Sequence, residues 1–342
     1  MVVGVARHLG ARLAERLSTD AAVDRVIGVD MVRPADGIGE AEFASADIRT
    51  SDIGRVIERT RPDTVVHMNI LATRSDAGGR SPQKEINVIG TMQLLAACQR
   101  SDSVCKLVVK SSTTVYGAGP NAPALFTEDM VPGTVARGGY EKDASEVEGY
   151  VRGFSRRRPD IDVTILRLAN VVGPTIRTAL SEYFLLPVVP IALGRDPRFQ
   201  LVHEQDCLDV LRHATLGDYP GIFNVAGPDF LVLSQALRRA GRMVLPLPTL
   251  GTPLVGGLMR RTGLADMDSA QVRFLTYGRG VDTTRMREQL QFEPAFGTVA
   301  AFDDFVQARA GCGWLGPERI RSAERGLRDL LSAPAGREES VS

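Results

Sequence analysis

The chain has 342 residues, of which 44% are hydrophobic and 24% charged, and its 41 basic and 41 acidic residues give a formal net charge of zero. This is the composition of a globular protein, with enough length for two domains. Because the charges balance, no net field favours nucleic acid or an anionic membrane as a partner, and neither is expected.

The chain opens MVVGVARHLGARLAERL: a short apolar run, a turn with Gly4 and Gly10, and an amphipathic helical pattern. Glycines at such a turn let backbone N–H groups approach a pyrophosphate at the helix N-terminus, which indicates a dinucleotide site. Asp30 ends the next strand, where a carboxylate accepts ribose hydroxyls and repels a 2′-phosphate, so NAD is expected over NADP. Arg7 stands at the middle position of the turn. Only three residues precede Gly4, about half a typical strand, so we expect a misassigned start codon.

Short β-branched runs alternate with helical patterns over the first 170 residues. The expected strands are Arg25–Asp30, Thr64–Met68, Lys106–Ser111 and Asp162–Leu168, and the helical patterns cover 10–18, 53–60 and 86–100. Because the strands are almost continuously apolar, we expect a parallel sheet buried on both faces. The alternation predicts an α/β fold with a doubly wound parallel sheet of the Rossmann type.

The alternation loosens after residue 174, where proline and glycine become frequent, and a smaller C-terminal lobe is expected there. The expected parts are a nucleotide-binding domain at 1–174 to which 200–226 returns, a substrate lobe at 175–199 and 227–330, and a disordered tail at 331–342. Two apolar stretches, 183–194 and 244–259, are interrupted by prolines and are expected to be loops packed on a core.

The cysteines show no CxxC or metal-type spacing, which predicts reduced thiols, no metal site and a cytoplasmic protein. They are Cys98, Cys105, Cys207 and Cys312. Lysine is rare beside arginine, which singles out each lysine that the chain contains. The lysines are Lys84, Lys106, Lys110 and Lys142.

Five later segments follow in a fixed order: ADIRTSD (46–52), NVIGTMQLL (87–95), KSSTTVYGAG (110–119), RLANVVGP (167–174) and VDTTRMREQLQFEP (281–294). With the glycine turn, this set resembles the extended short-chain dehydrogenase/reductase family, and within it the NAD-dependent epimerase/dehydratases, closest to the UDP-glucose 4-epimerase group. The resemblance implies hydride transfer to and from NAD at a hydroxyl carbon of a nucleotide-activated sugar, with a UDP-sugar as the expected substrate. The residues it assigns to NAD are Gly4, Arg7, His8, Leu9, Gly10, Asp30, Asp47, Ile48, Asn87 and Lys142.

The family's catalytic group is a Tyr that removes the hydroxyl proton, a Lys that lowers the pKa of that Tyr, and a Ser or Thr on the same oxygen. Tyr and Lys stand four residues apart because they must share one helix face. Ser112 matches the Ser of the motif. Lys142 matches the Lys, since Glu146 follows it by four residues. The Tyr position is then Gly138.

Two tyrosines are candidates to replace the missing base. Tyr140 lies two residues before Lys142 and reaches the site only if the two glycines before it make the turn irregular. Tyr116 of the VYG segment is the other candidate, although packing beside the substrate is its expected place.

The resemblance also implies substrate contacts by Thr114 and Asn170, and a diphosphate contact by Arg273, with Arg198 and Arg279 as alternatives. The helices expected at 83–99 and 141–157 resemble the family's dimer-forming pair, which implies a homodimer.

Two interpretations compete with the sugar enzyme. Gly138 favours a catalytically impaired NAD-binding sensor or scaffold that keeps the fold and lacks the Tyr base. A reductase acting on a carbonyl outside sugars is the other alternative, because lobe sequences of this kind do not reveal the substrate.

Overall fold

The structure is a computed structural model that describes residues 1–72, 78–130, 139–247 and 269–310. Gly138, Cys312 and the expected tail at 331–342 lie outside these residues. In the part of the chain that the structure describes, the cysteines are free thiols, and no helix is long and apolar enough to cross a membrane.

Seven parallel strands form the central sheet, in the order β11-β6-β5-β4-β1-β2-β3. They are β1 Val2–Val3, β2 Ile27–Asp30, β3 Glu42–Ser45, β4 Thr64–His67, β5 Lys106–Ser112, β6 Asp162–Leu168 and β11 Gly221–Val225. Strand order reverses between β1 and β4, as in a doubly wound fold. The fold class expected from the sequence is therefore confirmed.

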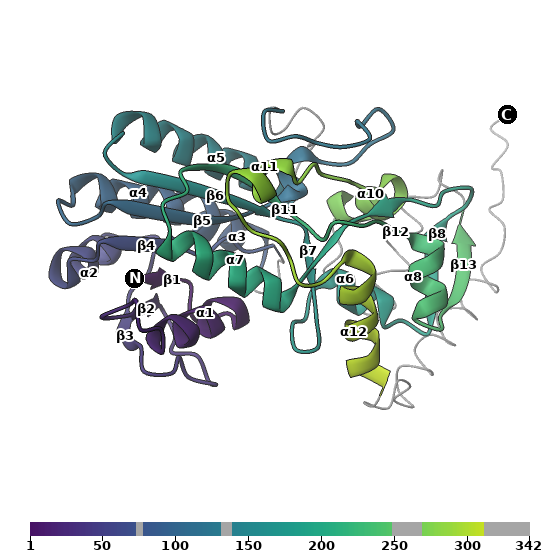
Figure 1. Cartoon of the computed structure of the whole chain (residues 1–342), viewed down its shortest axis with the longest axis horizontal. Helices are drawn as coiled ribbons and strands as arrows, with labels where there is room; N and C mark the ends of the chain where they lie inside the picture. The colour runs from purple at the N-terminus through teal and green to yellow at the C-terminus, as the bar shows by residue number, and fades with distance from the viewer. Residues whose placement is uncertain (73–77, 131–138, 248–268, 311–342) are drawn as a thin grey trace, which may run out of the picture.

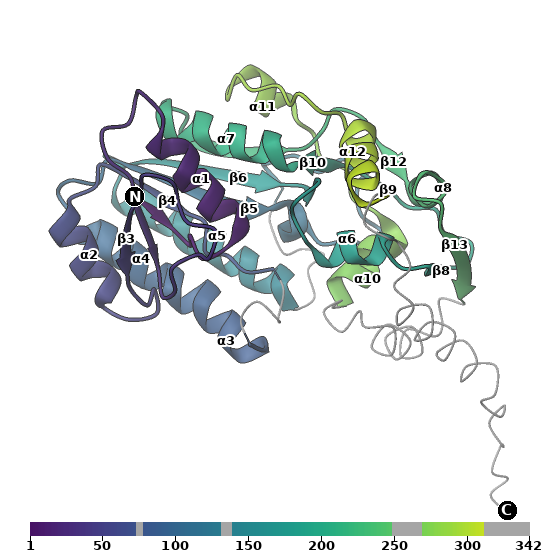
Figure 2. The same cartoon turned by 90° about the horizontal axis from the view of Figure 1, so that it is seen from below.

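Helices cover both faces of the sheet, which is why its central strands are mostly buried (Figures 1 and 2). α1 (His8–Ser18) and α7 (Glu204–Leu216) pack together on one face. The other face carries α2 (Asp52–Thr60), α4 (Thr91–Arg100) and α5 (Gly139–Arg157). α4 continues without a break from α3 (Arg80–Lys84) and the π-helical segment η2 (Glu85–Gly90).

The remaining elements form a second, smaller group around its own apolar core, in which the Phe184 ring meets Phe199 and Phe302. Its helices are α6 Ala179–Phe184, α8 Leu233–Arg239, α10 Ser269–Tyr277 and α12 Thr298–Ala310. Its strands pair two by two: β7 Asn170–Val172 with β10 Leu201–His203, β9 Arg198–Phe199 with β12 Leu231–Val232, and β8 Val188–Ala192 with β13 Met243–Leu247. The short α11 (Thr284–Glu288) and the 3₁₀ turn η3 (Thr113–Tyr116) complete the described elements.

The pairing of β8 with β13 contradicts the loops expected at 183–194 and at the start of 244–259. Pro190 lies within β8 and Pro246 within β13, and such prolines were the reason for expecting loops. In a two-stranded sheet each strand has an open edge, and a proline whose missing N–H faces that edge costs no ladder hydrogen bond. Proline is therefore compatible with these strands.

A buried ion pair fastens α5 to the sheet. Arg167 on β6 donates to Glu148 on α5 over 2.6 Å, and both side chains are 0% exposed. Ser111 on β5 donates to the same carboxylate over 2.6 Å, and Arg167 also donates to the Tyr116 hydroxyl over 2.7 Å. Two buried charges are tolerated only when each is paired and hydrogen-bonded, so this cluster depends on every member.

Replacement of Arg167 by Met should lower the free energy of unfolding by about 3–5 kcal/mol, because it leaves Glu148 buried beside an apolar side chain. The matched control is Arg152→Met, since Arg152 bonds the same carboxylate at 3.1 Å from a position that is 35% exposed. Loss of this exposed pair should cost at most about 1 kcal/mol. Urea unfolding at constant pH measures both variants. Equal losses would show that the buried pair does not anchor α5.

Candidate active site at the carboxyl end of the sheet

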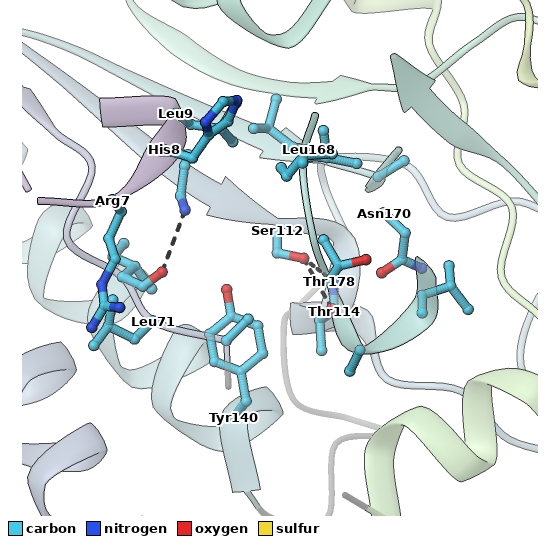
Figure 3. Close-up of a pocket in the computed structure, with 18 of the residues that line it drawn as sticks. Arg7, His8, Leu9, Leu71, Ser112, Thr114, Tyr140, Leu168, Asn170 and Thr178 are labelled. Carbon is cyan, nitrogen blue, oxygen red and sulfur yellow. Dashed lines mark hydrogen bonds between the residues drawn. The ribbon is translucent and has the colours of Figure 1, made fainter. Parts of the chain in front are cut away.

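A cavity of about 490 Å³ lies at the carboxyl ends of the central strands. The glycine turn lines it at residues 6–10, β5 at 110–112, and the chain entering the second group at 175–180. Figure 3 shows Tyr140 pointing into this space from α5, with His8, Ser112 and Asn170 around it. Ligands of doubly wound sheets bind at this edge, beside the point where the strand order reverses.

The glycine turn is built for close approach of backbone to a ligand. Gly4 has φ of +104°, and a Cβ added to Gly10 would lie 2.1 Å from the Gly4 carbonyl oxygen. Arg7 occupies the N-cap of α1, and its guanidinium has no acceptor for the first N–H groups of the helix. Those N–H groups therefore suit a bound anion at the cavity wall.

Asp30 holds this turn in place. Its carboxylate accepts the N–H of Ala6 over 2.9 Å and the N–H of Met31 over 2.8 Å. Burial raises the pKa of Asp30, and these two hydrogen bonds oppose the rise. Asp30 is not among the residues that line the cavity.

Tyr140 and Ser112 meet inside the cavity. Tyr140 and Ser112 both line the cavity, Ser112 acts on the Tyr140 phenol to lower its pKa, and the Ser112 hydroxyl lies 2.9 Å from that of Thr114. Burial raises the pKa of Tyr140 above its ordinary value of 10, and this is the largest effect on it. Gly139, with φ of +62°, starts α5 immediately before Tyr140. The left-handed backbone conformation is therefore at Gly139, whereas Tyr140 lies within the helix.

Lys142 does not reach the cavity. Its side chain is exposed on α5, two residues from the buried Tyr140. The residue four positions after Tyr140 is Ala144, which is 1% exposed. With Tyr140 at the Tyr position, the Lys position of the motif is Ala144. Lys142, which the sequence assigned to the Lys position, thus lies outside the cavity lining, whereas Tyr140 belongs to it.

Four further residues assigned to NAD lie outside the cavity lining: Gly4, Asp47, Ile48 and Asn87. Asn87 is fully buried and pairs with the backbone of Leu71, accepting its N–H over 2.7 Å and donating to its carbonyl over 3.0 Å. Asp47 is bound by Arg49, and Ile48 packs on η2. Asn87 therefore shapes the loop after β4, of which Leu71 does line the cavity.

Among the proposed substrate contacts, Thr114 and Asn170 line the cavity, whereas Arg273 forms an ion pair with Glu141 on α5. Arg279 does line it, and its guanidinium donates to the Gly117 carbonyl over 3.1 Å. Burial lowers the pKa of Arg279 to about 10, which leaves the side chain charged at neutral pH.

The other candidate base, Tyr116, is buried away from the cavity. Its hydroxyl accepts from Arg167 and donates to Asn224 over 2.7 Å each, and burial raises its pKa to about 12. It belongs to the cluster that anchors α5.

Sequence reasoning did not assign Lys110 to the site, yet this side chain lines the cavity. Its Nζ donates to the carbonyl of Ile70, in the loop after β4, over 3.4 Å. The rarity of lysine in the chain was the signal that pointed to it.

The comparisons with known proteins agree with this architecture. The model of the NAD dependent epimerase/dehydratase family matches residues 1–226. An uncharacterised protein of Mycobacterium tuberculosis is 44% identical over 328 residues, covering 95% of this chain and 87% of the relative. UDP-glucose 4-epimerase of Thermotoga maritima, solved with UDP-glucose, superposes with a TM-score of 0.67 at 19% identity, covering 91% of this chain and 98% of the other. UDP-glucuronic acid 4-epimerase of Bacillus cereus, solved with NAD, gives the same TM-score and coverage at 17% identity. The chain belongs to the NAD-dependent epimerase/dehydratase family, which confirms the resemblance found in its sequence and NAD as its cofactor.

Proposed function

We propose that this protein is an NAD-dependent enzyme that oxidises and re-reduces a hydroxyl carbon of a nucleotide-activated sugar, with a UDP-sugar as the first candidate. The observation that carries the proposal is that Tyr140 and Ser112 line one cavity beside the N-terminus of α1. The two solved epimerases whose fold it shares act on UDP-sugars, as their names state.

The residues present fit NAD. Gly10 has no room for a side chain, and the N-cap of α1 carries no acceptor, so a pyrophosphate can lie against the backbone of residues 7–10. NAD, when bound, supplies the hydride acceptor. Tyr140 Oη takes the proton of the sugar hydroxyl once the phenol is ionised, and Ser112 Oγ holds the same oxygen by a hydrogen bond.

Three arginines are placed for a diphosphate. Arg279 lines the main cavity and also a second cavity of about 240 Å³, to which Arg195 and Arg198 contribute. Guanidinium groups bind phosphate oxygens through paired N–H donors. We infer that these side chains hold the diphosphate of the substrate, a role that Arg273 cannot fill while it pairs with Glu141.

One observation favours the rival function, a non-catalytic NAD-binding sensor or scaffold. Ala144 stands where the family's Lys is expected, so α5 supplies no cation to Tyr140 from that position. The two functions differ in one respect that can be measured. The enzyme reduces its bound NAD when the right sugar is added, and the sensor binds NAD without reaction.

Replacement of Tyr140 by Phe should slow NAD reduction at least about 100-fold, because it removes the proton acceptor. The assay saturates the protein with NAD, adds UDP-glucose, UDP-galactose or other nucleotide sugars, and follows the near-ultraviolet absorbance of reduced nicotinamide. Tyr150→Phe is the matched control, since Tyr150 lies on the same helix and its hydroxyl bonds Glu146 at 3.3 Å. Silence across the panel, with NAD shown to be bound, would favour the sensor.

A Gly10→Ala change should abolish measurable NAD binding, since the new Cβ would lie 2.1 Å from the Gly4 carbonyl oxygen and force the turn open. Gly149→Ala serves as the control, because a Cβ there meets nothing within 4 Å. Calorimetric titration with NAD, after a thermal melt of each variant, measures the effect. Tight NAD binding by Gly10→Ala would rule out the glycine turn as the pyrophosphate site.

We also infer a homodimer through the face made by η2, α4 and α5, which contact one another. Ile89 and Met92 are 45% and 46% exposed on this face, an unusual position for two large apolar side chains on adjoining helical turns. The expected helices at 83–99 and 141–157 fall within this face.

A double change of Ile89 and Met92 to Asp should convert the dimer to a monomer, because it places charges in the proposed interface. The control is Leu193→Asp, which alters an apolar side chain that is 59% exposed in the second group of elements. Light scattering after gel filtration gives the mass of each variant. A wild-type monomer would refute the dimer, and a dimeric double variant would refute this face.

A further inference from the structure

The base of the proposed reaction lacks a cation on its own helix. Tyr140 is buried, and burial holds its pKa above 10. A phenol with that pKa is almost wholly protonated at neutral pH and cannot accept a proton from a sugar hydroxyl. A positive charge within about 4–6 Å lowers such a pKa by roughly 1–3 units. On α5 the matching position is Ala144, and Lys142 is exposed to solvent.

A lysine enters the same cavity from the sheet. Lys110 and Ser112 lie two residues apart on β5, so their side chains project from one face of the strand. Lys110, Ser112 and Tyr140 all line this cavity. Its Nζ is directed to the Ile70 carbonyl, so the ammonium lies at the carboxyl end of the sheet, between β4 and β5.

The charge of Lys110 acts on its buried surroundings. It contributes to the fall in the pKa of His67 to about 3, although burial is the larger cause. His67 is therefore neutral at neutral pH, with its Nε2 2.8 Å from the Thr91 hydroxyl, and does not compete as a cation.

We propose that Lys110 takes the part of the missing helix lysine: its ammonium stabilises the Tyr140 phenolate and donates to the nicotinamide ribose of NAD. This inference rests on the proposed function. In the forward step the Tyr140 phenolate gains the proton as the sugar O–H bond breaks, and the hydride leaves the same carbon for NAD. Lys110 stays protonated throughout, so its part is electrostatic and positional.

Other charged groups also face Tyr140. Asp143 and Glu148 on α5 raise its pKa, and each carboxylate is paired, with Arg80 and Arg167 respectively. Arg279 lowers its pKa, but the guanidinium is directed to the Gly117 carbonyl and, at 3.4 Å, to the Thr114 hydroxyl. Arg279 is the rival cation, and the experiment must separate it from Lys110.

The test compares Lys110→Met with Lys142→Met, which removes the exposed lysine of α5. Two quantities are measured without any sugar: the NAD dissociation constant, and the pKa of Tyr140 in the NAD-loaded protein. The second comes from tyrosinate absorbance, taken as the difference between each protein and its Tyr140→Phe counterpart. Lys110→Met should weaken NAD binding at least about tenfold, the loss of one charge-assisted hydrogen bond. It should raise the pKa of Tyr140 by about 1 unit or more. Lys142→Met should change neither.

Rescue separates a charge effect from a packing effect. Adding Ala144→Lys to Lys110→Met restores a lysine four residues after Tyr140 and should recover NAD affinity and the low pKa of Tyr140. Lys110→Arg should keep most of both, and Lys110→Gln replaces the Met variant if thermal melting shows that Met unfolds the protein. Where a reacting sugar is found, the alkaline shift of the pH–rate profile in Lys110→Met should match the shift in the pKa of Tyr140.

The proposal is overturned if Lys110→Met behaves like Lys142→Met in both measurements. It is also overturned if Arg279→Met moves the pKa of Tyr140 and Lys110→Met does not. Failure of every nucleotide sugar to react would sink the proposed function alone, since both measurements need only NAD.

Discussion

The ion pair between Glu148 and Arg167 determines where the reactive side chains lie. Glu148 follows Tyr140 by about two helical turns on α5, and Ser111, which donates to Glu148, is the neighbour of Ser112. One buried cluster thus positions both Tyr140 and Ser112, which line the cavity. Because the side chains of Glu148 and Arg167 are both fully buried, a shift of α5 along the sheet would leave a buried charge unpaired.

A second network joins the glycine turn to the other side of the cavity. The Thr175 hydroxyl, just after β7, donates to Glu204 at the start of α7 and therefore accepts from His8 Nε2, which lies 2.9 Å away. The N–H of Ile176 donates to the same carboxylate over 2.7 Å. His8 therefore links the glycine turn to the chain that enters the second group of elements, a role for its side chain that the turn motif does not predict.

The positions of Tyr140, Ala144 and Lys110 bear on one requirement of the proposed reaction, a cation near the buried phenol. A buried phenol needs a nearby cation to act as a base, and the field of that cation depends on distance and burial, not on the element that carries it. A strand residue two positions before Ser112 can deliver an ammonium to the same cavity as a helix residue four positions after Tyr140. Under the proposal for Lys110, the positive charge comes from β5 instead of α5, and the proposed reaction is the same.

The sequence alone determined the doubly wound sheet, the glycine turn and the family, because buried parallel strands and phosphate-binding turns leave local, ordered patterns. It did not reveal β3, whose four residues, EFAS, include only one that is buried. Of the predicted site residues, those that line the cavity are Arg7, His8, Leu9, Gly10, Ser112, Thr114, Tyr140 and Asn170. Those outside its lining are Gly4, Asp30, Asp47, Ile48, Asn87, Lys142 and Arg273. Lys142 is exposed on α5, whereas Tyr140, two residues earlier, lines the cavity. Only the tertiary structure placed Lys110 and Tyr140 in the lining of one cavity, since two residues thirty positions apart on a strand and a helix leave no spacing to read.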